Sequence, residues 1–456
     1  IDEAHQETLR ILEASDVDQT LVRRYAFALR FGKMNEALEI LRGRILPTTS
    51  KTVHTRIMNA GSGSSWAFIP DLMNSDYIRY PYEQPLDKIT IGHLGYTEDG
   101  EDKLANIIFH GDGHLLTIAP TGAGKSQRYI IPATLEYRGP MVIFDPKGEV
   151  YKETAWIRDW HGPVMKFAPF DPKGDSDSFN PLDTVESWDD ALVLTNLLFE
   201  EREGGDAFWE ASARDLVRGL IMYILRNRQE GRKNMRELLR LLAPSEDEFD
   251  ELINDLMTSG DEKFLELANV LSAMSEKMRA SVYQVARSHL DAWRSDAVSS
   301  VTESTTEAWT PRVTPQSTSL EETIVEYGHA ERVGYTTTDT AVIRGTTETY
   351  YIIVPPEKIA SYRSILRVIL GTTLSEAMKG KREEDPPKRP FMFVFDELPQ
   401  LGYMSLIEDS VAVARAAQIR LWFFVQDIGQ LRQTFKKWET IIANCRAQIF
   451  FKPADL

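Results

Sequence analysis

The stretch at residues 119–126, which reads A-P-T-G-A-G-K-S, constrains the fold of this chain more than any other feature. It follows an apolar run at residues 115–118 that has the length of a buried strand, and residues 127–135 can continue it as a helix. A strand, a glycine-rich loop and a helix in this order are typical of a phosphate-binding P-loop. The sequence therefore predicts an α/β fold in which a parallel sheet presents this loop at the end of a strand.

The residue types in this loop suit the phosphate chain of ATP. Gly122 and Gly124 let the backbone bend so that several N–H groups point at one phosphate chain, and the following helix adds its positive N-terminal end. We expect Lys125 to reach the β- and γ-phosphates and the hydroxyl of Ser126 to bind Mg²⁺. Ala119 replaces the usual first glycine, and a chance Gly-Lys-Ser turn is the weaker alternative because strand and helix flank the loop. The predicted nucleotide contacts are Ala119, Pro120, Thr121, Gly122, Ala123, Gly124, Lys125, Ser126 and Gln127.

Composition excludes several classes of protein. The chain has 456 residues, of which 42% are hydrophobic and 27% charged, as expected for a globular protein of about three domains. Because the net charge is −17, only a local basic patch can bind a phosphate backbone. The single cysteine, Cys445, rules out an intramolecular disulfide and fits a reducing cytoplasm. No run of eighteen apolar residues and no signal peptide is evident in the sequence.

Further apolar runs alternate with helical patterns, which favours a parallel sheet covered by helices on both faces. They lie at residues 141–144, 164–167, 350–354, 391–395, 421–425 and 448–451. We assign residues 46–180 and 348–456 to the first and second parts of one nucleotide-binding domain. Because the chain stops directly after the last of these runs, we expect a closing helix and an edge strand to be missing.

The segments outside this α/β pattern have their own character. Residues 1–45 predict a helical N-terminal segment. Residues 181–295 predict an all-α domain inserted into the nucleotide-binding domain, and residues 296–347 a polar linker or a loose hairpin excursion. Within the inserted domain the helical spacing is clearest at residues 191–200, 208–226, 235–242 and 266–287.

A second motif supplies the acidic groups that a P-loop requires. Residues 391–397 read F-M-F-V-F-D-E, an apolar strand that delivers two carboxylates to the edge of the sheet. This is the Walker B arrangement, in which Asp396 holds Mg²⁺ and Glu397 acts as the general base on the attacking water. Alone the pair is a weak signal, but it becomes strong together with residues 119–126.

Polar residues follow two other strands at the same edge. Gln426 ends the strand at residues 421–425, where it can sense or orient the attacking water, although a plain surface glutamine is the alternative. Asp145 and Lys147 follow the strand at residues 141–144, and a functional position and a solvated turn are about equally favoured for them.

At this point the chain resembles the type IV secretion coupling proteins, which are ATPases of conjugative DNA transfer. The resemblance covers roughly residues 60–456 and rests on an ordered set of motifs. These are A-P-T-G-A-G-K-S, D-P-K-G-E at 145–149, F-N-P-L at 179–182, F-W at 208–209, Y-I-I-V-P-P at 351–356, F-D-E at 395–397, the Arg415 and Gln426 positions and A-N-C at 443–445.

The resemblance implies a RecA-like P-loop NTPase domain interrupted by an all-α domain, which agrees with the pattern of the residues. It also implies a homo-hexameric ring at the cytoplasmic face of a bacterial inner membrane. The implied partners are components of the secretion channel, relaxase–DNA or effector protein cargo, accessory adaptor proteins and single-stranded DNA. The transmembrane helices usual at the N-terminus of the family are not evident in this chain.

Arg415 is a further candidate catalytic residue. Its neighbours are small or apolar, and positions 411 and 419 are Val and Ile, so no carboxylate lies four residues away. The resemblance implies an arginine finger at this spacing between Walker B and the glutamine, which would act on the ATP of a neighbouring subunit. The alternative is an ordinary arginine on a helix surface.

Three functions remain open from the sequence. The leading hypothesis is an ATP-hydrolysing motor that couples cargo to a type IV secretion channel. One alternative is a cytosolic hexameric DNA translocase, against which the all-α insertion and the F-W and F-N-P-L motifs argue. The other is an ATP-gated platform that docks effectors with little turnover.

Overall fold

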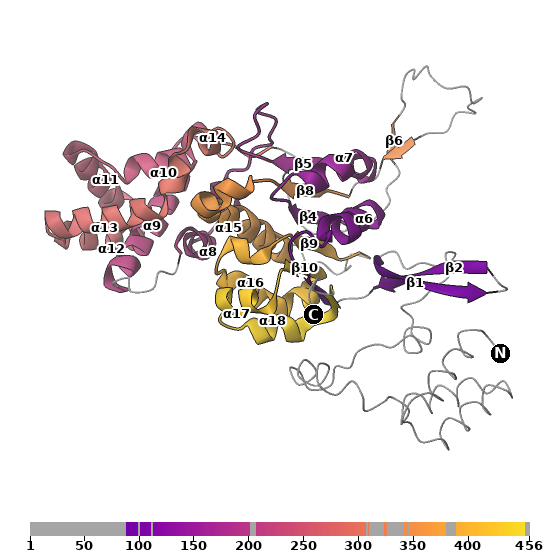
Figure 1. The fold of residues 1–456 in the computed structure, drawn as a ribbon. Coiled ribbons are helices and arrows are strands. Elements are labelled where there is room, and N and C mark those ends of the chain that lie inside the picture. Colours follow the sequence, from indigo (N-terminus) through magenta and orange to yellow (C-terminus); the bar gives the residue numbers. More distant parts are fainter. Residues whose placement is uncertain are drawn as a thin grey trace. The chain divides into compact units, whose positions relative to one another are not determined.

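The computed structural model describes residues 88–98, 101–110, 113–200, 207–306, 309, 323–325, 342–344, 347–379 and 389–451 (Figure 1). By its internal contacts the chain divides into two units, Ile1–Gly111 and Asp112–Leu456. The predicted N-terminal helical segment 1–45, most of the predicted linker 296–347 and the last five residues lie outside the described residues. Across the described ranges, no helix combines the length and the apolar character needed to span a bilayer.

The described part of the first unit is an antiparallel pair of strands. Strand β1 (Ile89–Glu98) pairs with β2 (Glu101–Phe109), and the register shifts between Thr90 and Gly92. A shift of this kind marks a β-bulge, which bends and twists the ribbon locally.

The second unit is built around a seven-stranded sheet with the order β11-β3-β10-β9-β4-β8-β5. Every pair in it is parallel. The strands are β3 (His114–Ile118), β4 (Met141–Phe144), β5 (Val164–Phe167), β8 (Thr349–Ile352), β9 (Phe391–Phe395), β10 (Ile419–Val425) and β11 (Cys445–Phe450). Strand β10 lies between the P-loop strand β3 and the Walker B strand β9. Their carboxyl ends therefore meet at one edge, as ligand sites in parallel sheets require.

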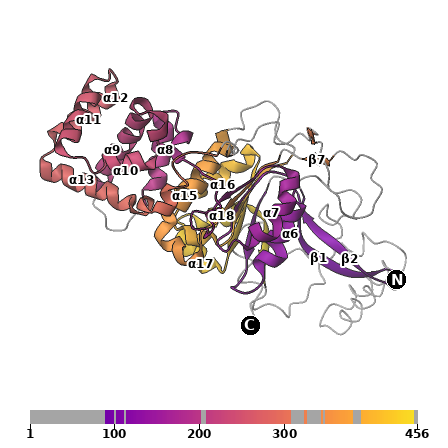
Figure 2. The ribbon, with the colours of Figure 1, turned by 90° about the horizontal axis from the view of Figure 1, so that it is seen from above.

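Helices cover both faces of this sheet (Figure 2), which explains why its central strands are apolar on both sides. Helices α6 (Ile131–Glu136) and α7 (Glu149–His161) lie on one face. The other face carries α15 (Pro356–Lys379), α16 (Ser405–Val413), α17 (Ile428–Thr434) and α18 (Trp438–Asn444). This doubly covered parallel sheet is the α/β fold that the sequence predicts.

Between residues 181 and 300 the regular elements of the described residues are all helices. The helices are α8 (Trp188–Leu198), α9 (Ala207–Asn227), α10 (Met235–Leu241), α11 (Glu246–Thr258), α12 (Glu262–Ala273), α13 (Glu276–His289) and α14 (Asp296–Ser299). The helical spacing at residues 266–287 covers parts of two helices, because the chain breaks between α12 and α13. Met274 is extended, and Ser275 caps α13 by accepting a hydrogen bond from the Met278 N–H.

The helical region is held to the sheet region by close packing of α8 on α15. A Cβ added to Gly371 would lie 2.5 Å from Cδ2 of Leu197, so only glycine permits this approach. The buried residues of both regions form one continuous hydrophobic cluster. The helices are therefore anchored on the sheet domain by a hydrophobic core that both regions share.

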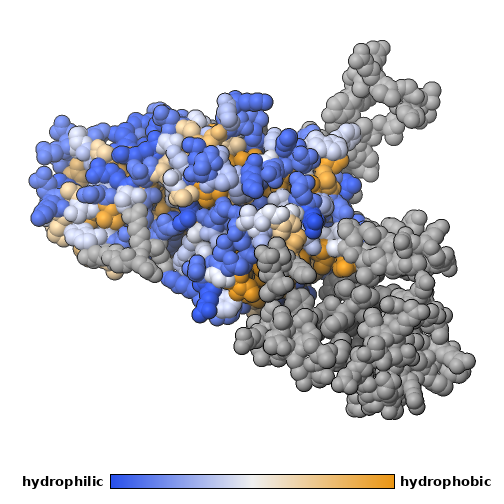
Figure 3. Space-filling model, in the orientation of Figure 1, coloured by the Kyte–Doolittle hydropathy of each residue, from blue (hydrophilic) through white to orange (hydrophobic). Residues whose placement is uncertain are grey.

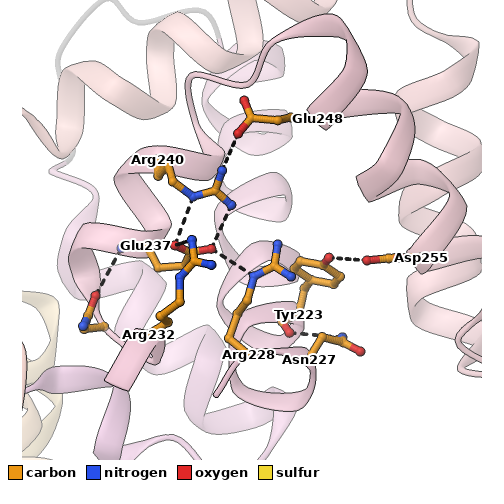
Figure 4. Close-up of polar contacts among 9 residues, drawn as sticks. Tyr223, Asn227, Arg228, Arg232, Glu237, Arg240, Glu248 and Asp255 are labelled. Atoms are coloured by element: carbon orange, nitrogen blue, oxygen red, sulfur yellow. Dashed lines mark hydrogen bonds and ion pairs between the residues drawn. The ribbon is translucent and has the colours of Figure 1, made fainter. Parts of the chain in front are cut away.

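An ion cluster ties the helical region together internally (Figure 4). Arg228, Arg232 and Arg240 each lie 2.9 Å from the carboxylate of Glu237, which is 5% exposed. Although burial raises the pKa of Glu237, hydrogen bonds from Arg240 and Arg228 hold it below its usual value. Figure 3 shows a mainly hydrophilic surface over these helices, with small apolar areas scattered on it.

Part of the predicted linker 296–347 is described. Strand β6 (Thr323–Val325) pairs antiparallel with β7 (Val342–Arg344). Of the two interpretations of this segment, the pairing favours the hairpin excursion.

Candidate nucleotide site

The P-loop follows β3 and turns on two glycines. Gly122 and Gly124 have φ values of 77° and 80°, in the left-handed region that glycine adopts without strain. Within the turn, the Ala123 N–H donates to the Pro120 carbonyl at 3.2 Å. A loop that bends at both positions can direct successive N–H groups at one phosphate chain.

Ala119 tolerates its replacement of the usual glycine because it lies in ordinary backbone. Among the described non-glycine residues only Glu397 and Gln418 have positive φ. The Ala119 side chain is fully buried, and its N–H donates to the Val425 carbonyl of β10 at 2.9 Å. The substitution therefore leaves the loop geometry intact.

The helix after the loop starts with a wider turn than the sequence predicts. Residues Ser126–Ile130 form one π-helical turn before α6 begins. Pro132, in the first turn of α6, has no N–H to donate to the carbonyl four residues earlier, which disfavours an α-helical turn here. Thr121 and Gln127 are exposed and Ser126 is half-buried, so all three border the open side of the loop.

Three predicted catalytic side chains converge at the carboxyl edge of the sheet. Nζ of Lys125 lies 3.4 Å from Oε1 of Glu397, and Lys125 is only 8% exposed. Nε2 of Gln426, which directly follows β10, donates to the same oxygen at 3.3 Å. Gln426 is half-buried and bonded to Glu397, and its role toward the attacking water stays a prediction.

Two buried carboxylates lie at the same edge. Asp396 follows β9 and Asp145 follows β4, and burial raises the pKa of each to about 6. One oxygen of Asp396 is buried with no hydrogen-bond donor among the described residues. A buried acceptor without a donor is costly unless a cation or water meets it, so the site fits a Mg²⁺ ion.

Asp145 and Lys147 have different environments. Asp145 is 1% exposed and accepts a hydrogen bond from the Tyr151 N–H in the first turn of α7 at 2.9 Å. Lys147 is exposed. The solvated-turn interpretation holds for Lys147 but not for Asp145.

Glu397 is held in a strained position by Gln400, a residue that no sequence motif indicated. The φ of 62° and ψ of 55° of Glu397 are left-handed, which is rare for a residue with a side chain and concentrates at functional sites. Gln400, three residues later, donates from Nε2 to Oε2 of Glu397. Its place in the P-Q-L-G turn after the acidic pair was the only sequence signal for this role.

Arg415 lies apart from these groups within the chain. It belongs to a short 3₁₀ turn, Ala414–Ala417, that follows α16, and it is half-buried. No ion pair joins it to any carboxylate of the described residues. Its guanidinium is therefore available to a group outside this subunit.

A sequence profile for the family described as "Type IV secretory system Conjugative DNA transfer" matches residues 80–306 and 335–455. The chain belongs to this family. The match includes the P-loop, the helices α8–α13 and the Walker B strand.

Two individual relatives are similar to most of this chain. The conjugal transfer protein TraG of Escherichia coli is 25% identical over 421 residues, covering 85% of this chain and 61% of the relative. Protein VirD4 of Rhizobium rhizogenes is 22% identical over 408 residues, covering 86% of this chain and 54% of the relative. The chain thus spans 61% and 54% of the length of these two relatives.

Solved structures show the same fold. The bacterial conjugative coupling protein TrwBdeltaN70 aligns with a TM-score of 0.53 at 19% identity, over 74% of this chain and 69% of that one. The plasmid coupling protein TrwB bound to the ATP analogue ADPNP aligns with the same TM-score of 0.53, over 74% of this chain and 70% of that one. The RecA-like P-loop fold class predicted from the sequence is confirmed.

Proposed function

We propose that this chain is the ATP-hydrolysing motor part of a coupling protein that feeds DNA–protein or protein substrates into a bacterial type IV secretion channel. The observation that carries the proposal is the contact of Glu397 with both Lys125 and Gln426 at one sheet edge. A base, a phosphate-binding cation and a polar sensor placed together are the parts that γ-phosphate hydrolysis needs. TrwB structures contain ADPNP in one case and ADP with Mg²⁺ in another, which supports ATP and Mg²⁺ as cofactors here.

Each side chain has a role in this mechanism. The backbone of residues 119–126 holds the phosphates, and Lys125 moves from Glu397 to the β- and γ-oxygens when ATP binds. Ser126 and Asp396 hold Mg²⁺, which neutralises the developing charge when bound. Lys125 leaves one oxygen of Glu397 free to accept a proton from the attacking water, and Gln426 orients that water.

Substitution of Glu397 by glutamine tests the proposal. We expect Glu397→Gln to bind ATP normally and to hydrolyse it at least about a hundredfold more slowly, because glutamine cannot accept the proton of the attacking water. Binding of a fluorescent ATP analogue and phosphate release are the two measurements. The exposed Glu439 on α18 provides the matched control Glu439→Gln, with wild-type turnover expected. Turnover by Glu397→Gln at the wild-type rate would remove Glu397 from the mechanism.

We further propose that the active form is a hexameric ring in which Arg415 completes the site of the neighbouring subunit. The absence of an ion pair to Arg415 among the described residues supports this role. A guanidinium that reaches the γ-phosphate of the neighbour contributes on the order of a thousandfold in rate. An isolated subunit is then expected to bind ATP but to hydrolyse it poorly.

Mixed rings test the role of Arg415. Arg415→Ala subunits are combined with Lys125→Ala subunits, each inactive alone, and phosphate release is measured. Some interfaces then pair an intact Lys125 with an intact Arg415, so partial recovery of activity is expected. Rings shown to be mixed that recover nothing would contradict the role in trans.

The remaining parts of the proposal concern cargo and location. The family description, type IV secretory system conjugative DNA transfer, supports a secretion channel and transferred DNA as partners. From the resemblance we further propose relaxase–DNA or effector cargo, accessory adaptor proteins and single-stranded DNA as partners, and a location at the cytoplasmic face of the inner membrane. A DNA translocase of the cytosolic kind and a docking platform with little turnover are the competing functions. Measured turnover that rises with DNA excludes the platform, and channel components that co-purify with the full-length protein exclude the cytosolic translocase.

A further inference from the structure

A cleft lies where the helical region meets α15. It has a volume of about 500 Å³ and is bordered by the end of α8, the end of α13 with the turn Asp291–Arg294, and the first half of α15. A second hollow shares Ser288, Asp291 and Arg294 with it and extends it to Arg287. Because they share these three residues, the two hollows are continuous and form one groove.

This cleft is basic although the whole chain carries a net charge of −17. Arg287, Arg294, Arg363 and Arg367 line it, against the carboxylates of Glu200 and Asp291. Glu200 already pairs with Arg367 at 3.2 Å and with Arg363 at 3.8 Å. Neither Arg287 nor Arg294 forms an ion pair with any described residue, so their guanidinium groups are available to an anion.

The other lining groups favour phosphate on a nucleic acid. The hydroxyls of Ser288, Ser295, Ser361 and Ser364 border the cleft together with the half-buried ring of Tyr362. Arginine and serine are the usual partners of backbone phosphates, and an aromatic ring offers a stacking surface for an unpaired base. We propose that this cleft binds the phosphodiester backbone of single-stranded nucleic acid and that the bound strand controls the position of Glu397. The control of Glu397 rests on the function proposed above.

The physical link between the cleft and Glu397 is a short series of contacts. Arg363, which pairs with Glu200 in the cleft, donates from Nε to the Gln400 carbonyl at 3.0 Å. The side chain of Gln400 in turn donates to Glu397. Arg363 also passes so closely over Gly402 that a Cβ there would lie 2.7 Å from its Cδ. Arg363 therefore contacts the C-terminal end of the turn that carries Gln400.

The link continues into the helical region. The Glu200 N–H donates to Nδ1 of His289 at 3.4 Å, and Nε2 of His289 lies 2.9 Å from Glu210 on α9.

Helix α15 departs from helical geometry at Tyr362, next to Arg363, with φ of −114° and ψ of 19°. A phosphate that competes with Glu200 for Arg363 and Arg367 thus acts where the helix already bends. Arg363 then shifts against the Gln400 carbonyl, and the Gln400 amide moves relative to the carboxylate of Glu397.

Binding is tested with a fluorescein-labelled oligothymidylate of about thirty nucleotides and fluorescence anisotropy at several salt concentrations. We expect the double variant Arg287→Gln/Arg294→Gln to bind at least about tenfold more weakly. The slope of its log affinity against log salt should fall by roughly 0.7 for each phosphate that the variant no longer neutralises. Lys277 is an exposed residue at the start of α13, outside the cleft, so Lys277→Gln is the matched control with affinity within about twofold of wild type. Equal weakening in both variants would indicate general electrostatics and overturn the site.

Two competitors identify the ligand. Polyglutamate that displaces the oligonucleotide at equal charge concentration would assign the cleft to an acidic protein and overturn the nucleic-acid assignment. Inorganic phosphate is expected to compete only weakly, because it binds at one position where the strand binds at several. Full displacement by phosphate at low millimolar concentration would reduce the cleft to a site for single anions.

The link to Glu397 is tested with Gln400→Met, which removes the amide donor and keeps the length of the side chain. We expect oligonucleotide affinity as in wild type, an unchanged KM for ATP and a roughly tenfold lower hydrolysis rate in the presence of saturating oligonucleotide. Gln400→Glu, which places a second carboxylate against Glu397, should lower the rate at least as much. A stimulation ratio equal to wild type in both variants would break the proposed link.

The two proposals fail in distinguishable ways. A wild-type chain that hydrolyses no ATP under any condition contradicts the proposed function, and the anisotropy measurements still decide whether the cleft binds the strand. A wild-type chain that hydrolyses ATP at one rate with and without bound oligonucleotide leaves the motor intact and overturns the control of Glu397.

Discussion

At the carboxyl edge of the central sheet the buried carboxylate of Asp396 has an oxygen without a donor among the described residues, whereas at the amino edge the buried guanidinium of Arg158 is well bonded. Burial raises the pKa of both Asp396 and Asp145 to about 6. At the opposite edge, Arg158 is fully buried, and its Nε and Nη2 donate to Thr349 Oγ1 and the Gly139 carbonyl at 2.7 and 2.8 Å.

At the amino edge, Arg158 and its three acceptors form a structural contact that we call the clamp. Arg158 also donates to the Tyr137 carbonyl, so one guanidinium joins α7 to the chain entering β4 and to the first residue of β8. Burial lowers the pKa of Arg158 to about 10, which leaves it charged at neutral pH. Charged hydrogen bonds to buried carbonyls are among the stronger polar interactions in proteins.

The contrast shows which buried charges serve the fold and which serve the site. Partners for the clamp come from the chain itself, so the clamp is complete without a ligand. The acidic edge is completed only by a cation and a nucleotide, and until then it costs stability. Strain at Glu397, the left-handed residue beside Asp396, follows the same rule.

The strongest test of the contrast is Asp396→Asn. We expect hydrolysis to fall several hundredfold, because asparagine is a poor Mg²⁺ ligand. The free energy of unfolding without ligand should rise by about 1 kcal/mol, since the variant no longer buries a charge. Denaturant unfolding and phosphate release measure the two effects. Asp409→Asn, at an exposed residue of α16, is the control. A variant that loses both activity and stability would place Asp396 with the clamp.

The next test is Arg158→Met, which keeps much of the volume of the side chain and removes its donors. We expect the free energy of unfolding to fall by about 3 kcal/mol, because buried carbonyls are left without partners. Hydrolysis per folded molecule should stay near wild type at low temperature. The exposed Lys152 on the same helix gives the control Lys152→Met, with a change within about 0.5 kcal/mol. Wild-type stability of Arg158→Met would contradict the clamp.

The sequence predicts the acidic edge better than the basic one. The P-loop and the Walker B strand can be identified from the sequence, because phosphate and Mg²⁺ chemistry dictates their residue types and order. Strands such as Phe391–Phe395 match the predicted run residue for residue, since continuous apolar sequence indicates burial on both faces. The predicted roles of Lys125, Glu397 and Gln426 stay predictions, although the structure brings the three side chains together.

The features that the sequence did not predict depend on distant contacts. Arg158, in a charged stretch of α7, has the sequence character of a surface arginine, because its partners Tyr137, Gly139 and Thr349 lie elsewhere in the chain. The break at Met274 is local, but helical spacing continues across it. The boundaries of the predicted inserted domain and the role of Arg415 also stay predictions.

The smallest expected effect concerns the acid sensitivity of the basic edge. His161 precedes β5, and burial together with Arg158, Arg138 and Arg389 lowers the pKa of its imidazole to about 3. Nδ1 of His161 accepts a hydrogen bond from Arg158 at 3.2 Å, which requires the neutral ring. The unfolded chain takes up a proton at this residue near pH 6.5, whereas the folded chain does so only near pH 3. The contribution of His161 to the free energy of unfolding therefore falls as the pH drops from 6.5 toward 3.

We expect His161→Asn to flatten this dependence. Asparagine keeps an acceptor for Arg158 and does not titrate, so the wild type should lose stability relative to the variant by up to about 1.4 kcal/mol per pH unit below about pH 6.5. Burial raises the pKa of the neighbouring Glu348 to about 7, which changes stability in the opposite direction but equally in both proteins. Denaturant unfolding at about pH 7, 6 and 5 spans the range over which the unfolded imidazole takes up its proton and so measures the difference. Parallel profiles for the two proteins would mean that His161 is protonated in the folded chain, and the basic edge would then lack the acceptor that completes it.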